Sequence, residues 1–157
     1  MPKAIYADLT RCIYCRACEV ACEKEHNGLK GIFVLFRERF AVPLNCHHCE
    51  KGPCSTVCYT QALVRGNVGD MALDIAKCTG CKLCIFACPF GVINFDITAK
   101  VVTKCDLCLE RLGERKEPSC VATCPSRALY YSHYEDFMRK LKKKAAFVMI
   151  QAISSRG

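Results

Sequence analysis

The sequence predicts an α+β fold in which short helices and β-hairpins alternate with cysteine-rich loops. Sixteen of the 157 residues are cysteine, and they form four groups of four with none left over. Short apolar segments broken by glycine, asparagine and aspartate lie between the groups, which is typical of hairpins. The stretch from Tyr134 to Ser155 lacks such breaks and predicts a terminal helix.

The third group of cysteines has the most informative spacing. It runs from Cys78 to Pro89 and reads C-x2-C-x2-C-x3-C-P, the pattern that holds a 4Fe–4S cube in bacterial-type ferredoxins. A loop this short wraps only three corners of a cube, so the fourth cysteine, Cys88, is expected to face a second cluster. Pro89 then ends the helical turn, because it has no N–H.

Three further groups complete the set. They are Cys12, Cys15, Cys18 and Cys22; Cys46, Cys49, Cys54 and Cys58; and Cys105, Cys108, Cys120 and Cys124. Disulfides are disfavoured, because Met1 to Asp8 holds no apolar signal region. Zinc is the other alternative, but zinc sites use four ligands in two pairs, and three cysteines at three-residue spacing leave one over.

The charge fits clusters better than nucleic acid. The side chains sum to +8, and four thiolate-bound cubes would bring about −8, roughly −2 each. A near-neutral loaded protein with no tryptophan and no binding module is not expected to bind nucleic acid. The missing signal region predicts a cytoplasmic protein, with export alongside a partner's signal as the alternative. Residues 145–153 are apolar but too short for a transmembrane segment, which needs about 20 residues.

The first part of the chain contains a repeat. Residues 4–9 predict a short strand, and Cys18 to Glu25 predict a helix that Asn27-Gly28 ends. Asp8 to Cys12 and Asp74 to Cys78 share an acid, two intervening residues, a base and the first cysteine. The two loops are therefore expected to fold alike.

Between the loops lie extended segments. Residues 32–44 predict one extended strand crossing between two halves of the molecule, or alternatively part of a protein contact. Residues 62–64 with 71–75 predict one hairpin, and residues 92–95 with 101–103 predict another. Leu109 to Ser119 is charged and predicts a solvated loop, or alternatively a docking loop.

Four histidines and one tyrosine complete the candidate site residues. His47 and His48 lie between two cysteines but are not needed as ligands, and we expect them beside a cluster or in solvent. His26 and His133 are expected at the surface. Tyr59 stands where the third and fourth groups have Pro89 and Pro125, which predicts a looser turn there.

The terminal helix is amphipathic and basic. Phe137, Leu141 and Ala145 fall on one side, and lysines dominate the middle. A basic helix with an apolar end could lie on a membrane surface. Packing against the body of the protein or against a partner is the preferred interpretation.

These motifs resemble the four-cluster ferredoxin family. The resemblance covers residues 4–131 and rests on the four quartets, on Pro43 to Cys49, and on the Cys-Pro pairs at Cys88 and Cys124. That family supplies electron-transfer subunits to dimethyl sulfoxide reductase, formate dehydrogenase, hydrogenase and carbon monoxide dehydrogenase systems, and similar small subunits accompany tungsten aldehyde oxidoreductases. It implies two pseudo-symmetric ferredoxin-like halves and four 4Fe–4S clusters as cofactors.

The resemblance also implies a ligand swap between groups. The implied sets are Cys12, Cys15, Cys18 and Cys124 (cluster 1); Cys46, Cys49, Cys54 and Cys88 (cluster 2); Cys78, Cys81, Cys84 and Cys58 (cluster 3); and Cys105, Cys108, Cys120 and Cys22 (cluster 4). The outer half would comprise residues 1–45 and 100–132, the inner half residues 46–99, and the helical tail residues 133–157.

No substrate pocket motif, dinucleotide motif or activated nucleophile is visible, so no catalytic residue is expected. The expected function is electron transfer through four clusters, between a catalytic subunit and another carrier. The catalytic subunit would be an aldehyde oxidoreductase or similar tungsten or molybdenum enzyme, or a carbon monoxide dehydrogenase. A flavin or other electron-acceptor subunit is a further expected partner, and self-association is a third. The alternatives are a freely diffusing polyferredoxin and a zinc-stabilised interaction protein.

Overall fold

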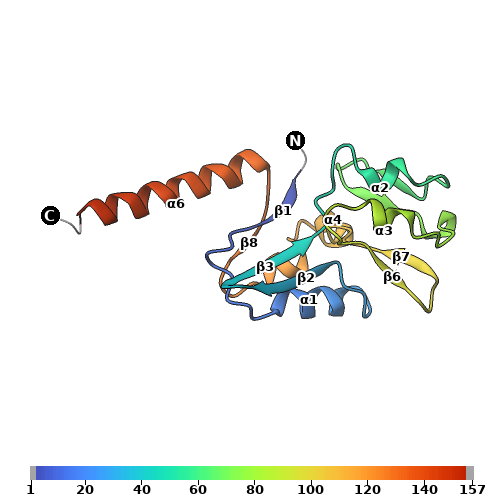
Figure 1. Cartoon of the computed structure of the whole chain (residues 1–157), viewed down its shortest axis with the longest axis horizontal. Coiled ribbons are helices and arrows are strands. Elements are labelled where there is room, and N and C mark those ends of the chain that lie inside the picture. Colours follow the sequence, from blue (N-terminus) through green and yellow to red (C-terminus); the bar gives the residue numbers. More distant parts are fainter. Residues whose placement is uncertain (1–2, 155–157) are drawn as a thin grey trace.

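The fold is α+β, as predicted, and its sheets are small. The structure is a computed structural model that describes residues 3–154 (Figure 1). Its strands form four separate two-stranded antiparallel sheets. The strand β1 (Ala4–Ala7) pairs with β8 (Leu129–Ser132), which brings the two ends of the cysteine-containing region together.

The remaining strands form local hairpins. These are β2 (Ile32–Arg37) with β3 (Phe40–Asn45), β4 (Leu63–Arg65) with β5 (Met71–Leu73), and β6 (Asn94–Asp96) with β7 (Val101–Thr103). The last two confirm the two predicted hairpins, the first around Gly66 to Asp70 and the second around Asp96 to Lys100.

Short helices follow the cysteine loops. They are α1 (Ala17–Glu25), α2 (Pro53–Thr56), α3 (Leu83–Ala87), α4 (Leu109–Gly113) and α5 (Ser119–Ala122), with a single 3₁₀ turn, η1 (Ile75–Lys77). The predicted end of α1 is confirmed, because Asn27 and Gly28 both have positive φ. The predicted stop before Pro89 is confirmed as well, since α3 ends at Ala87.

The expectation of one crossing strand over residues 32–44 is wrong. The chain reverses direction after β2, and β2 pairs with β3 along its whole length, from Ile32 opposite Asn45 to Arg37 opposite Phe40. The reversal occurs at Glu38, whose φ is 57°. Because glycine, the usual residue for that conformation, is absent there, the turn left no local signal in the sequence.

The predicted charged loop after Cys108 is also corrected, since its first turn is the helix α4. Two leucines at three-residue spacing, Leu109 and Leu112, give that turn an apolar side among charged residues. Leu112 packs against the buried core. This tertiary contact stabilises the helical turn, which the charged composition of the segment does not predict.

Buried side chains gather in two clusters. The larger contains Ile5, Cys18, Cys22, Ile32, Val34, Ala41, Cys46, Val92, Cys105, Leu107, Cys120 and Leu129. The smaller contains Cys54, Leu63, Met71, Cys84, Ile93 and Val102. The hairpin of β6 and β7 joins residues on both sides of the predicted division at residue 99.

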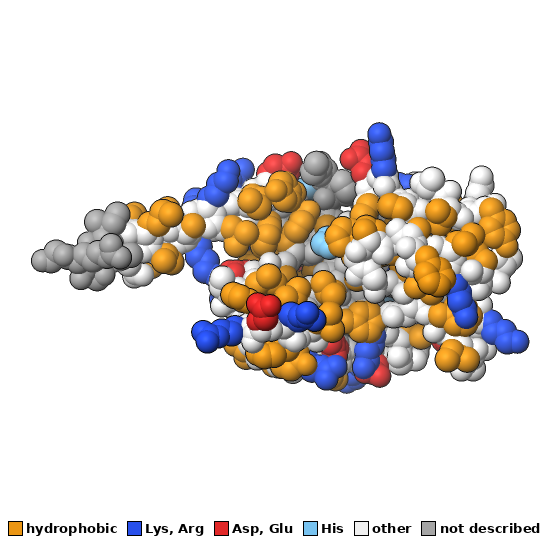
Figure 2. All heavy atoms as spheres, viewed as in Figure 1, with side chains coloured by type: hydrophobic (Ala, Val, Ile, Leu, Met, Phe, Trp, Pro, Cys, Tyr) orange, Lys and Arg blue, Asp and Glu red, His pale blue; other side chains and the backbone are white. Residues whose placement is uncertain are grey.

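The helix α6 (Tyr134–Ser154) leaves the body of the protein (Figure 1). Its base is anchored by Phe137, which is buried and stacks on Tyr6 with ring centroids 5.0 Å apart. Figure 2 shows basic side chains near this base and apolar ones beyond them. From Phe147 to Ile150 every side chain is exposed. Among the described residues no helix is long and apolar enough to cross a membrane.

Candidate iron–sulfur centres

The four cysteine loops share one backbone turn. The residue before the second cysteine is left-handed in each loop: Tyr14 (φ 56°), His48 (48°), Gly80 (68°) and Leu107 (62°). Such turns collect neighbouring backbone N–H groups into a concavity that suits an anionic group, iron–sulfur sites included. Four sequences that differ at this position therefore reach the same local geometry.

The predicted repeat at the first and third loops is confirmed in detail. Asp8 Oδ1 accepts a hydrogen bond from the backbone N–H of Thr10 at 3.1 Å, and Asp74 Oδ1 accepts one from Ala76 at 3.1 Å. The matching acids therefore make the same turn just before Cys12 and before Cys78.

A second common turn follows the fourth cysteine in three of the groups. Gln61, Gly91 and Arg127 are left-handed, and their N–H groups donate to the carbonyls of Cys58, Cys88 and Cys124 at 3.0, 3.3 and 3.1 Å. Tyr59 thus does not loosen the turn, contrary to expectation. Its hydroxyl lies 2.9 Å from Thr79 Oγ1 in the neighbouring loop, a contact that proline could not make.

All sixteen cysteines lie among the described residues and are free thiols. Cys15 and Cys81 are exposed. The buried ones are Cys18, Cys22, Cys46, Cys54, Cys84, Cys105, Cys108 and Cys120, and the rest are partly exposed. Burial raises the pKa of Cys84 to about 11 and that of Cys105 to about 12. Since iron binds the thiolate, these buried sulfurs need the positive charge of a metal to lose their protons.

The outer groups approach each other. Burial raises the pKa of Cys18 to about 12, and the nearby thiols of Cys124 and Cys12 raise it further. Burial likewise raises the pKa of Cys120, with added contributions from Cys105, Cys108 and Cys22. Thiols affect one another in this way only when they are close.

The inner groups approach each other in the same way. After burial, Cys46 and Cys88 are the neighbouring thiols that raise the pKa of Cys54. The raised pKa of Cys84 has contributions from Cys81, Cys54 and Cys58. The fourth cysteine of each inner group therefore lies near a cysteine of the other: Cys88 near Cys54, and Cys58 near Cys84.

Backbone N–H groups point at the sulfurs. Gly31 N donates to Cys22 Sγ at 3.2 Å, Leu107 N to Cys105 Sγ at 3.4 Å, and Ala128 N to Cys124 Sγ at 3.2 Å. Hydrogen bonds of this kind stabilise coordinated thiolates. Sulfur donors in groups, with N–H groups directed at them, fit 4Fe–4S clusters, each of which would supply one-electron redox chemistry when bound.

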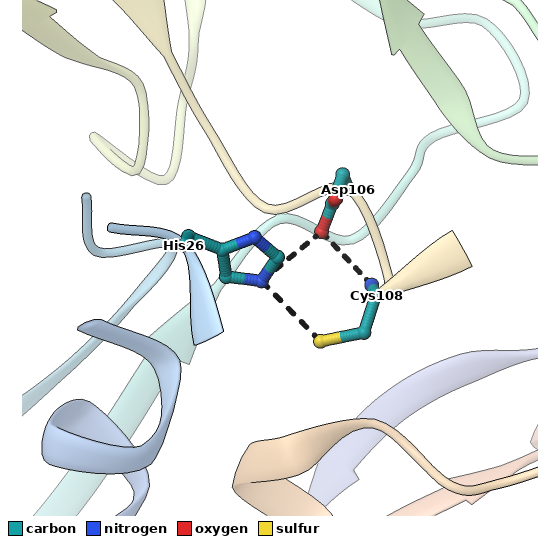
Figure 3. A group of neighbouring side chains, drawn as sticks. All are labelled: His26, Asp106 and Cys108. Atoms are coloured by element: carbon teal, nitrogen blue, oxygen red, sulfur yellow. Dashed lines mark hydrogen bonds and ion pairs between the residues drawn. The ribbon is translucent and has the colours of Figure 1, made fainter. Parts of the chain in front are cut away.

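The histidines occupy different environments. His48 is buried and its Nδ1 accepts a hydrogen bond from Met71 N at 2.9 Å, and the His47 ring packs on Phe90. His26 was expected at the surface, which is wrong: its Nε2 lies 3.4 Å from Cys108 Sγ (Figure 3). His133 is partly buried between β8 and α6.

Two residues that lie near the cysteines were not predicted from the sequence. Lys104 Nζ donates to the carbonyl of Cys105 at 2.9 Å, and its charge partly offsets the burial that raises the pKa of Cys46. Gly31 passes so close to Cys105 that a Cβ would lie 2.6 Å from the Cys105 Cα. The position of Lys104 beside the first cysteine of its group was a usable signal. Gly31 had none, because its neighbour is distant in sequence.

Comparison with known proteins agrees with this chemistry. Residues 37–134 match the 4Fe-4S dicluster domain family. Formate hydrogenlyase subunit 2 of Escherichia coli K12 is 33% identical, over 92% of this chain and 88% of the relative. A subunit of the anaerobic dimethyl sulfoxide reductase of the same organism is 30% identical, over 86% of this chain and 75% of the relative.

A third relative from that organism, YsaA, is 35% identical over 88% of this chain and 95% of its own length, and its name describes an electron transport protein. The cysteine geometry and these relatives agree on one chemistry. The chain belongs to the ferredoxin-like iron–sulfur electron-transfer subunits that contain a 4Fe-4S dicluster domain.

Proposed function

We propose that this chain holds four 4Fe–4S clusters in two pseudo-symmetric halves and passes electrons between a catalytic redox subunit and a second carrier. The ligand sets are those that the family resemblance implied. They are Cys12, Cys15, Cys18 and Cys124; Cys46, Cys49, Cys54 and Cys88; Cys78, Cys81, Cys84 and Cys58; and Cys105, Cys108, Cys120 and Cys22. The helical tail, residues 133–157, of which 155–157 fall outside the described part of the chain, would belong to neither half.

One observation carries this proposal. In each set the fourth cysteine comes from a different group, and it alters the pKa of one of the other three cysteines of that set. Cys124 raises the pKa of Cys18, and Cys88 raises the pKa of Cys54. Cys58 raises the pKa of Cys84, and Cys22 raises the pKa of Cys120. These four proximities support the swap, which no spacing within a single group requires.

The same contacts between sets support a single path. Cys18 raises the pKa of Cys120, so clusters 4 and 1 would be neighbours. Cys46 raises the pKa of Cys105, so clusters 4 and 2 would be neighbours. Cys54 raises the pKa of Cys84, so clusters 3 and 2 would be neighbours. The order would be 1, 4, 2, 3, and the terminal sets contain the two exposed cysteines, Cys15 and Cys81. Electrons would then enter and leave where the ligands meet solvent.

The side chains around the sulfurs have a defined task in this function. Buried neighbours such as Ile32 and Leu107, which belong to the same buried cluster as Cys22 and Cys105, would exclude water from cluster 4. Backbone N–H groups, such as that of Gly31, stabilise the charge that accumulates on the sulfurs and so set the potentials. No residue acts on a substrate, and the catalytic reaction belongs to the partner.

The proposed partner is a catalytic oxidoreductase, of the tungsten or molybdenum aldehyde-oxidising class or a carbon monoxide dehydrogenase, with a flavin or other acceptor subunit beyond it. The exposed apolar side chains from Phe147 to Ile150 and those of Leu35 and Phe36 support a protein-bound state over free diffusion. The same surfaces would also serve self-association. Co-purification of the untagged partner, with the mass of the complex, discriminates these cases from a freely diffusing polyferredoxin.

The first test is composition. Anaerobically purified protein is expected to hold about 16 irons and 16 acid-labile sulfides per chain, four of each per cluster. Electron paramagnetic resonance after dithionite reduction is expected to show coupled signals. Stoichiometric zinc without sulfide would instead establish the zinc-stabilised interaction protein and end the electron-transfer proposal.

The second test addresses the swap. Cys22→Ser is expected to damage the cluster of Cys105, Cys108 and Cys120, and to spare that of Cys12. The matched variant Cys12→Ser is expected to damage the other signal. If both variants removed the same resonance, Cys22 would be a ligand of its own group's cluster and the pairing would be wrong.

A further inference from the structure

We propose that the Nε2–H of His26 donates a hydrogen bond to Sγ of Cys108, and that this bond makes the reduction potential of cluster 4 more positive. The inference deepens the proposed function and rests on the ligand set of Cys22, Cys105, Cys108 and Cys120. His26 is a positioning residue in this scheme, because it acts through the sulfur of a ligand.

The geometry places the ring directly on the ligand. His26 is the residue that ends α1, and its own N–H donates to the carbonyl of Cys22 at 3.0 Å. From there the ring turns toward the loop after β7, and Nε2 lies 3.4 Å from Cys108 Sγ (Figure 3). About a quarter of the His26 side chain is exposed (24%), and Cys108 is buried.

The neighbours of Nε2 determine where the ring proton lies. Asp106 Oδ1 is 3.5 Å away and already accepts the N–H of Cys108 at 2.8 Å. A cysteine that binds iron is a thiolate and can only accept. Since Nε2 faces two acceptors, it must carry hydrogen. Both the Nε2–H neutral ring and the imidazolium satisfy this requirement, so the bond does not depend on the charge of the ring.

The energetic effect follows from the direction of the bond. Reduction adds one negative charge to the cluster, part of which resides on the cysteine sulfurs. A donor at the sulfur stabilises that charge, and hydrogen bonds to the sulfurs are among the factors that set iron–sulfur potentials. In the proposed sets of clusters 3 and 1, side-chain hydroxyls lie at longer range from the fourth cysteine: Thr60 Oγ1 is 3.6 Å from Cys58 Sγ, and Ser126 Oγ is 3.7 Å from Cys124 Sγ.

His26, Asp106 and Cys108 also have the donor set of a separate metal ion, since their ligand atoms lie within 4.8 Å of one another. We favour the hydrogen bond because Cys108 belongs to a cysteine group of cluster spacing, and because the carboxylate is already engaged by the backbone. Metal analysis tests this directly, since a separate ion would be lost on replacing His26 while iron and sulfide stayed constant.

The experiment is a redox titration of the anaerobically purified whole chain, followed by electron paramagnetic resonance. His26→Phe removes the donor and keeps a planar ring, His26→Gln keeps an N–H donor, and His133→Phe is the matched control. Iron and sulfide contents are measured first. In His26→Phe, one cluster is expected to show an approximately tenfold lower reduced-to-oxidised ratio at fixed potential, equivalent to about 59 mV for one electron.

The control and the conservative variant complete the test. His26→Gln is expected to restore most of the ratio, and His133→Phe to leave all four potentials unchanged. Full cluster content with unshifted potentials in His26→Phe would overturn the inference. The shifted signal must be the one that Cys22→Ser damages. A shift in another signal would refute the ligand sets while leaving the bond in place, and an absence of clusters in the wild-type chain would refute the proposed function itself.

A second readout needs no variant. In wild-type protein with isotopically labelled histidine, pulsed electron paramagnetic resonance of the reduced state is expected to detect a histidine nitrogen coupled to one cluster. If no histidine nitrogen were coupled, the hydrogen bond would be refuted even where His26→Phe failed to assemble.

Discussion

The backbone at Gly31 passes between two cysteines that are far apart in the sequence. Its N–H donates to Cys22 Sγ, and the place a Cβ would occupy is 2.6 Å from the Cys105 Cα and 2.9 Å from the Cys105 nitrogen. Both obstacles are backbone atoms, which cannot rotate away as a side chain would. Glycine is required here by close approach, and the requirement concerns the two cysteines assigned to cluster 4.

Gly31→Ala is therefore expected to lose cluster 4, with iron falling from about 16 to about 12 per chain, four irons for one cube. The matched control is Gly113→Ala, because a Cβ at that position meets no atom within 4 Å. Iron and sulfide analysis of both variants gives the answer. Full iron content in Gly31→Ala would mean that the loop moves aside without cost, and that Gly31 does not constrain the site.

At the scale of elements, an ion pair joins α6 to the start of the first cysteine loop. Lys144 Nζ lies 2.6 Å from Asp8 Oδ2 and also bonds the hydroxyl of Thr10. The carboxylate of Asp8 is nearly buried while Lys144 is partly exposed. Burial raises the pKa of Asp8, but the hydrogen bonds from Lys144 and Thr10 outweigh it, so the pKa of this carboxyl is held below its ordinary value.

This pair predicts a pH dependence. Because the folded pKa of Asp8 is below the unfolded one, its stabilising contribution is complete at neutral pH and is lost as the pH falls through the folded value, below about 4. Lys144→Ala is expected to cost roughly 1 kcal/mol at pH 7, and the difference from wild type should vanish in acid.

Because loss of the clusters is expected to make unfolding irreversible, the appropriate measurement is a rate. The decay of cluster absorbance in guanidinium is followed against pH for wild type, Lys144→Ala and the control Lys142→Ala, an exposed lysine on the same helix. A pH-independent difference between wild type and Lys144→Ala would show that the effect does not pass through Asp8.

At the scale of the whole molecule, the cores contain cysteines that we propose as cluster ligands. Among the described residues, five of the twelve that form the larger buried cluster are cysteines, so much of the interior is organised by what binds them. Without metal, eight buried thiols would lie where a protein of this size needs apolar packing. The remaining apolar side chains are too few to stabilise four separate two-stranded sheets.

Removal of iron is therefore expected to unfold the body of the protein, as in other small metal-dependent domains. Circular dichroism before and after anaerobic chelation, followed by reconstitution with iron and sulfide, measures this. Retention of the native spectrum after complete iron removal would show that the side chains alone specify the fold.

The division between what could and could not be predicted follows sequence distance. Hairpins β4–β5 and β6–β7, the end of α1 at Asn27 and the repeat at Asp8 and Asp74 were predictable, because turn residues and spacing act over a few positions. The hairpin at Glu38 was missed because a non-glycine residue adopts the left-handed turn. The helix α4 was missed because only the packing of Leu112 distinguishes it from a charged loop.

By itself the sequence determined the chemistry: sixteen cysteines at cluster spacing, with no residue left for disulfides and no motif for a substrate. Ligand spacing is local, so it survives without knowledge of the fold. Tertiary structure alone decided which residues surround the sulfurs. His26 and Cys108 are 82 positions apart, and Gly31 meets Cys105 across a similar distance in the chain. Such contacts arise because folding brings α1 and β2 against the last cysteine group, and no periodicity or composition encodes that proximity.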